Sequence, residues 1–126
     1  MATRGRIAIK RKDGSYLSTY NNSDSGPDSL GKTLNDHWND DAIIQEAIQL
    51  GDCSSWNETI EENRYYGRDY DEADTGPMVS KNIQILLDEG TAAWEEYVYV
   101  RENNEWSMFH NRKKVNLKKY LEKENI

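Results

Sequence analysis

Two parts of the chain carry the alternation of apolar and polar residues that is typical of β-hairpins. In the first part, Ile7 and Ile9 share one side of an extended segment, because side chains in a strand alternate with a period of two. Asp13–Gly14 is a dipeptide that favours tight hairpin turns, and strand-forming residues follow it. The pattern predicts a hairpin with strands over residues 5–12 and 15–21.

The second alternating part lies nearer the carboxyl end of the chain. Val98 and Val100 alternate there with large aromatic and charged side chains. Asn103–Asn104 is a turn signal, and another segment that contains aromatic residues follows it. We therefore expect a second hairpin over residues 94–110.

Between the hairpins the apolar spacing changes to the three-to-four-residue spacing of helices. Leu30, Leu34 and Trp38 follow one another at intervals of four and form an apolar stripe. Similar stripes predict helices over residues 28–38, 40–50, 80–89 and 115–126. The pattern indicates an α+β fold, an antiparallel sheet from two β-hairpins with three to four helices packed on one face. The expected core residues are Ile7, Ile9, Leu34, Trp38, Ile48, Val98 and Val100.

Residues 52–78 show no clear hydrophobic period. Within them, residues 69–78 are acidic, rich in turn-forming residues and nearly free of apolar side chains, so we expect a mobile loop there. Neither a repeat nor a Gly/Ser-rich linker divides the chain, and residues 1–126 are expected to form a single domain. No apolar run approaches the roughly 20 residues of a membrane-spanning helix. The first residues also lack the apolar stretch of a secretory signal.

Charge is distributed unevenly along the chain of 126 residues, whose net charge is −7. Residues 1–12 contain five basic and no acidic side chains, and residues 13–96 contain 19 acidic and four basic ones. Residues 97–126 are basic again, with seven basic and four acidic side chains. Two interpretations remain open at this point. The acidic span is either a solvated surface that keeps the protein soluble or a patch that meets a basic partner surface.

The chain contains a series of short motifs in a fixed order. They are Met1–Ile9, Asp13–Ser15, Gly31–Leu34, His37–Trp38, Leu50–Ser55, Tyr66–Asp69, Glu96–Tyr99 and Glu105–Trp106. This order resembles a family of small uncharacterised phage and prophage proteins. The resemblance implies a phage origin and a location in the cytoplasm of the infected bacterial host, and it implies no reaction. Relatives often carry a Cys-His-Trp-Asp-Gly-Tyr-Pro loop where this chain has Asn21–Pro27, so a Cys/His site there would be lost.

Side chains that usually carry catalysis are few. The chain has two histidines, His37 and His110, and one cysteine, Cys53, and no sequence spacing brings them together. The neighbouring Asp52 favours the protonated form of the thiol, which is not the nucleophilic form. Residues 26–33 match the spacing of a phosphate-binding loop, but polar residues precede them where that loop requires a buried strand. The sequence predicts no metal ion and no cofactor.

The strongest candidate for a binding surface lies within residues 64–74. Tyrosines alternate there with arginines and acidic residues, a composition found in protein interfaces and in sites that stack on nucleobases. The predicted partner-binding residues are Tyr65, Tyr66, Arg68, Asp69, Tyr70, Asp71, Glu72 and Asp74. Packing of the same residues inside the fold is the alternative interpretation.

We expect a phage accessory protein that binds and inhibits a host protein with a basic surface, in host takeover or anti-defence, through its acidic surface. One alternative is a protein that sequesters a host signalling nucleotide with Arg64, Arg68 and the neighbouring tyrosines. Another is a small enzyme with an unrecognised site. No membrane partner is expected, and the net charge of −7 disfavours direct binding of nucleic acid.

Overall fold

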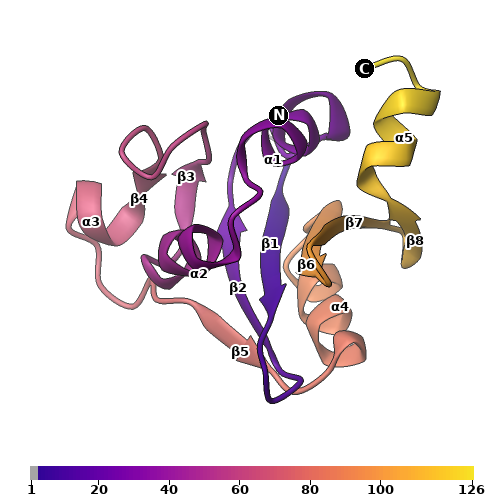
Figure 1. Ribbon diagram of the computed structural model, residues 1–126. Coiled ribbons are helices and arrows are strands. Elements are labelled where there is room, and N and C mark those ends of the chain that lie inside the picture. Colours follow the sequence, from indigo (N-terminus) through magenta and orange to yellow (C-terminus); the bar gives the residue numbers. More distant parts are fainter. Residues whose placement is uncertain (1–2) are drawn as a thin grey trace.

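A computed structural model describes residues 3–126, so the first two residues of the Met1–Ile9 motif lie outside the described part. Its centre is an eight-stranded mixed sheet in the order β4-β3-β2-β1-β6-β7-β8, with β5 paired to β2 (Figure 1). The strands are β1 (Gly5–Lys10), β2 (Tyr16–Asn21), β3 (Cys53–Ser55), β4 (Arg64–Tyr65), β5 (Met78–Ser80), β6 (Tyr97–Glu102), β7 (Glu105–His110) and β8 (Lys113–Asn116). The helices are the π-helical turn η1 (Pro27–Gly31), α1 (Lys32–His37), α2 (Asp41–Gln49), α3 (Tyr66–Tyr70), α4 (Ile83–Ala92) and α5 (Leu117–Lys123).

Both predicted hairpins are present, and the α+β class is confirmed. β1 pairs antiparallel with β2, and β6 pairs antiparallel with β7. Asn103 and Asn104 form the second turn with φ of 54° and 60°, a left-handed conformation that asparagine tolerates well. The expectation of a purely antiparallel sheet is wrong, because β1 and β6 join the two hairpins in parallel. Turn signals fix pairing within each hairpin and contain no information on the pairing between them.

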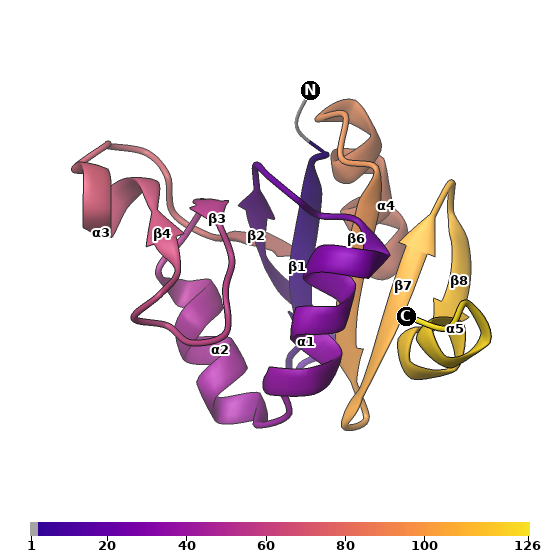
Figure 2. The same cartoon turned by 90° about the horizontal axis from the view of Figure 1, so that it is seen from above.

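The expectation that all helices cover one face of the sheet is also wrong. Ile7 pairs with Tyr99 in the parallel register, and both lie in a core with α1, α2 and α5. Val98 and Val100 lie on the opposite face, where α4 covers them with Leu86 and Leu87. Figure 2 shows α1 and α2 on one side of the sheet and α4 on the other. All seven expected core residues are buried, but they belong to two cores.

Local signals place the other helix boundaries. Asp40 caps α2, since its side chain accepts hydrogen bonds from the backbone amides of Ala42 and Ile43. Asn82 caps α4, which begins at Ile83 rather than at residue 80 because β5 uses the preceding residues to pair with β2. The short strand β8 replaces the expected start of the last helix, and α5 follows it. No helix within residues 3–126 is long and apolar enough to cross a membrane.

The acidic loop between α3 and β5 is exposed over most of its length. One backbone contact holds it near its carboxyl end, where the amide of Asp52 donates a 2.7 Å hydrogen bond to the carbonyl of Thr75. The mobility expected for residues 69–78 stays a prediction. Amide hydrogen exchange tests it directly, because fast exchange is the signature of local opening and strong protection across the loop would contradict it.

Candidate functional site

The predicted binding residues lie in a segment that we call the acidic arm, residues 52–77. It contains β3, β4, α3 and the loop to β5, and it forms one end of the sheet (Figure 1). The arm has eight acidic side chains and two basic ones. β3 joins the arm to the rest of the sheet through the pairing of Asn21 with Cys53. The arm is therefore a short, strongly negative extension of the central sheet.

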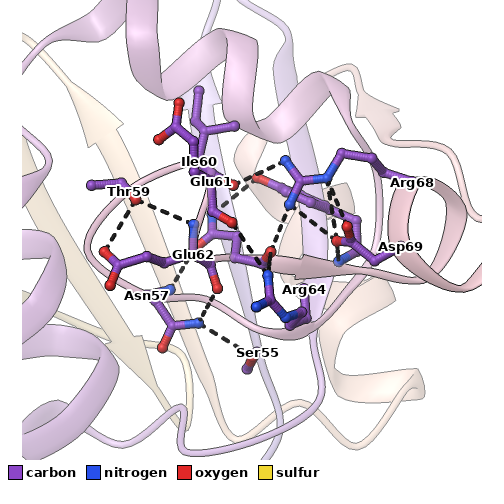
Figure 3. A network of polar contacts seen from close by, with 11 residues as sticks. Ser55, Asn57, Thr59, Ile60, Glu61, Glu62, Arg64, Arg68 and Asp69 are labelled. Atoms are coloured by element: carbon purple, nitrogen blue, oxygen red, sulfur yellow. Dashed lines mark hydrogen bonds and ion pairs between the residues drawn. The ribbon is translucent and has the colours of Figure 1, made fainter.

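Arg68 is the central cross-link of the arm (Figure 3). Its guanidinium donates to the backbone carbonyls of Ile60 at 3.0 Å and Asn63 at 2.7 Å. It also contacts the carboxylate of Asp69 at 3.0 Å and lies 4.8 Å from the centre of the Tyr65 ring. These contacts occupy most of the donors and the aromatic face that a nucleotide would require. Arg68 thus ties the loop before β4 to α3.

Two buried side chains complete this support. Asn63 is fully buried, accepts a hydrogen bond from the backbone amide of Asn57 and donates a 3.0 Å hydrogen bond to the Tyr65 hydroxyl. Tyr65 is fully buried as well, and its burial raises the pKa of its hydroxyl well above the usual value. Buried polar groups are expensive unless they are paired, and here each has a partner. Asn63 and Tyr65 thus form a satisfied polar pair at the centre of the arm.

The structure therefore divides the predicted binding residues into two groups. Tyr65, Arg68 and Asp69 support the arm, since the carboxylate of Asp69 also accepts a 2.8 Å hydrogen bond from the Tyr65 amide. Within residues 3–126, the side chains of the other group make no hydrogen bond or ion pair, and all of them but the half-buried Tyr66 are exposed. Its members are Tyr66, Tyr70, Asp71, Glu72 and Asp74. We call this second group the acidic surface.

The acidic surface is displayed by a loop that is fixed near both ends. Asp71 ends α3 with a left-handed φ of 55°, and the amide of Glu72 donates a 3.0 Å hydrogen bond to the carbonyl of Tyr66. At the other end, Thr75 lies directly over Gly51, which has a φ of 95°. A Cβ atom on Gly51 would lie 2.2 Å from the Thr75 carbonyl oxygen. Only glycine fits at this contact.

Tyr70 and Tyr66 supply the aromatic part of the acidic surface. Their ring centres are 6.2 Å apart, and Tyr70 is 53% exposed, which is unusual for so large a side chain. Tyrosine is enriched at protein interfaces because it combines a large contact area with a polar hydroxyl. The exposed Tyr70 and the half-buried Tyr66 beside carboxylates match the composition of a protein-binding surface.

Two ion pairs elsewhere in the fold contrast with the acidic surface. Arg6 forms a buried 2.8 Å ion pair with Glu95, and Lys10 lies 3.4 Å from Glu102. Burial raises the pKa of Glu95, and the hydrogen bond from Arg6 opposes that effect. Within residues 3–126, no ion pair involves an acid of the acidic surface. Those carboxylates carry their charge into solvent.

The histidines and the cysteine contact separate parts of the fold. His37 lies 3.5 Å from Glu58, and the Nδ1 atom of His110 contacts the carbonyl of Glu96. Cys53 is fully buried, and burial followed by the charge of Asp52 raises the pKa of its thiol. Across the described residues, no cluster of three or more His, Cys, Asp or Glu side chains is placed to hold a metal ion.

The loop that departs from the phage-protein pattern has a structural role here. Asn21 and Ser25 are buried, and the Asn21 side chain donates a 2.9 Å hydrogen bond to the Ser25 hydroxyl. The hydroxyl of Tyr99 donates a 2.7 Å hydrogen bond to the Ser25 carbonyl. These contacts fasten the loop to the end of β2 and to β6.

Comparison of the chain with family models, with curated proteins and with solved structures finds no match. The resemblance to phage proteins remains an expectation from the quoted motifs.

Sequence reasoning missed a polar cavity between α1 and α5, because its lining residues are scattered from Asn35 to Glu122. No local motif could have pointed to it.

Proposed function

We propose that the protein is a binding module that docks its acidic surface on a basic surface of a protein partner and blocks that partner. The observation that carries this proposal is the set of unpaired, exposed carboxylates Asp71, Glu72 and Asp74 beside Tyr70, on a loop fixed near both ends. Because backbone contacts hold the loop near both of its ends, the entropy cost of binding falls mainly on the residues between these contacts.

Electrostatics gives the proposed interaction a clear signature. Opposite charges steer two proteins toward each other, and salt screens this attraction over about 8 Å at physiological ionic strength. Charge steering acts mainly on the association rate. The resemblance to phage proteins makes a host protein the proposed partner, with host takeover or anti-defence as the biological role.

A neutralised variant tests the proposal. Asp71→Asn, Glu72→Gln and Asp74→Asn together remove three charges, and asparagine tolerates the left-handed φ of 55° at residue 71 and 59° at residue 74. A matched control removes three exposed charges outside the arm through Glu46→Gln, Glu96→Gln and Glu124→Gln. Partners are captured from a lysate of the host, identified, purified and measured for association rate at several salt concentrations.

The expected partner has a basic surface, and its association with the parent slows as salt rises. The neutralised variant should associate at least tenfold more slowly at low salt, and the control should stay near the parental rate. Equal rates for the parent and both variants would overturn the proposal. A salt-independent rate would do so as well.

A further inference from the structure

A polar cavity of about 520 Å³ lies between α1 and α5, near the turn that joins β6 to β7. Figure 2 shows these two helices on the same side of the sheet, at β6 and beyond β7. The cavity shares no residue with the acidic arm, so its chemistry is independent of the proposed function. Its lining is Asn35, Asn39, Arg101, Asn104, Glu105, Trp106, Asn116, Lys118, Lys119 and Glu122. All of these residues but Trp106 carry amide, carboxylate or cationic groups.

Arg101 supplies a buried positive charge to this cavity. The residue is 4% exposed, and its guanidinium lies 5.8 Å from the centre of the Trp106 ring. Nε donates a 2.8 Å hydrogen bond to Asp41, and Nη2 donates a 3.2 Å hydrogen bond to the Asn39 carbonyl. The Asp41 side chain is 48% exposed, so water partly screens this ion pair. Within residues 3–126 the guanidinium donates through Nε and Nη2, and the ion pair with Asp41 offsets part of its charge, which leaves Nη1 as the donor without a partner in the protein.

The other lining groups divide into two chemical sets. Lys118 and Lys119 are exposed and have no ion-pair partner in the described part of the chain, so they add two unpaired cations. Asn116 uses its side-chain oxygen to accept a 3.0 Å hydrogen bond from the Lys119 amide, which leaves its NH₂ group as a donor. The remaining asparagines and the two glutamates add both donors and acceptors.

This mixture discriminates between classes of ligand. Lys118 and Lys119, with the remaining donors of Arg101, attract a phosphate, but Glu105 and Glu122 would repel a ligand that carries negative charge throughout. Carboxylates and amides instead suit hydroxyl groups, which donate and accept hydrogen bonds. The one aromatic side chain of the lining, Trp106, is 4% exposed and offers little surface to a hydrophobic ligand. The volume lies within the range of small-molecule sites.

We propose that the cavity binds a small phosphorylated polyol, the chemistry shared by sugar phosphates and by the ribose phosphate of a nucleotide. Arg101, Lys118 and Lys119 hold the phosphate, and the asparagines and glutamates bind the hydroxyl groups. The site differs from the nucleotide site expected at Arg68, whose guanidinium is occupied by the arm.

Two pairs of lysines provide a matched test. Lys118→Gln with Lys119→Gln removes two charges at the cavity, and Lys113→Gln with Lys114→Gln removes two exposed charges from the neighbouring β8, outside it. Binding of ribose 5-phosphate, ribose, inorganic phosphate and adenosine 5′-monophosphate to the purified full chain is measured by titration calorimetry. NMR of the side-chain NH₂ groups of Asn35, Asn39, Asn104 and Asn116 locates the site and confirms that each variant is folded.

Ribose 5-phosphate should bind the parent, shift these amide signals, and bind the Lys118/Lys119 variant at least tenfold more weakly. The Lys113/Lys114 variant and the neutralised arm variant should bind within twofold of the parent. Binding of adenosine 5′-monophosphate at least as tight as that of ribose 5-phosphate assigns the site to nucleotides, and weaker binding assigns it to sugar phosphates. The proposal would be overturned if inorganic phosphate alone or ribose alone bound as tightly as ribose 5-phosphate. It would also be overturned if none of the four probes bound.

Discussion

The two ends of the sheet are both strongly charged, but they are held together differently. The acidic arm has eight acidic and two basic side chains, and residues 105–126, here called the basic end, have six basic and three acidic ones. In the basic end, Trp106, Met108, Leu117 and Leu121 are buried in the main core. The arm contributes fewer buried apolar groups and relies on the hydrogen bonds of Arg68 and Asn63.

This difference decides which charged residues are free to bind. In the basic end apolar packing holds the helix, so Lys118 and Lys119 remain exposed and unpaired in the described structure. In the arm, Arg68 and Asp69 are used in folding, although the sequence places them in the middle of an attractive binding motif. Charged and aromatic residues indicate a site only when the fold does not already use them.

The largest expected effect is at the core of the basic end. Leu117 is fully buried, and Leu117→Ala should lower the free energy of unfolding by about 2–5 kcal/mol through lost burial and a cavity. Urea denaturation measures the loss, which should affect the whole fold. The control is Val79→Ala, at a residue that is 51% exposed, and its effect should stay below about 1 kcal/mol. Comparable losses in the two variants would show that the basic end is not held by this core.

Gly51 should be the most sensitive position next to the arm. Gly51→Ala forces a Cβ to within 2.2 Å of the Thr75 carbonyl at a φ of 95°, and should cost about 2–4 kcal/mol in the free energy of unfolding. Gly76→Ala is the control, because no atom lies within 4 Å of its added Cβ. Thermal unfolding compares the two variants. A stable Gly51→Ala protein would mean that the loop is not fixed at Thr75.

Loss of Arg68 should loosen the arm without unfolding the remainder. Arg68→Ala removes hydrogen bonds to two backbone carbonyls, and we expect a loss of about 1–2 kcal/mol, since water replaces part of these contacts. Hydrogen exchange should accelerate within residues 56–70 and stay unchanged in β6 and β7. Arg64→Ala is the matched control, because its hydrogen bonds to the carbonyls of Glu61 and Asn63 are longer, at 3.2 Å and 3.3 Å, and reach only one to three residues along the chain. Its exchange should resemble that of the parent. Uniform acceleration of hydrogen exchange throughout the sheet in Arg68→Ala would contradict a local role for Arg68.

The smallest expected effect is a change in how the free energy of unfolding varies with pH. Burial raises the pKa of Asp52 above its ordinary value of 3.8, although its Oδ1 accepts a 3.1 Å hydrogen bond from the Tyr20 amide. The folded protein therefore binds more protons than the unfolded chain just above pH 3.8, and this carboxylate lowers stability as pH rises through that window. Asp52→Asn keeps the acceptor without the charge. Denaturation at several pH values should show its stability relative to the parent increasing from pH 3 to pH 6. A stability difference between Asp52→Asn and the parent that does not vary with pH would contradict a raised pKa at Asp52.

The sequence by itself determined the local parts of this fold. Alternation at Ile7 and Ile9 with the Asp13–Gly14 turn defines the first hairpin, and the asparagine turn defines the second. The interval of four between Leu30, Leu34 and Trp38 gives a buried stripe, and all three residues are in the core. These predictions succeed because periodicity and turn conformation depend on neighbours only a few residues apart.

Tertiary structure alone decided how these parts meet. β1 and β6 are about 90 residues apart in the chain, and their parallel register sends Val98 to the α4 face while Tyr99 joins Ile7 on the other. The tertiary structure also engages Arg68 in hydrogen bonds within the arm, and it brings Arg101 beside Lys118 and Lys119 at one cavity. Such contacts depend on side-chain packing and strand pairing over long sequence separations, which no local pattern encodes.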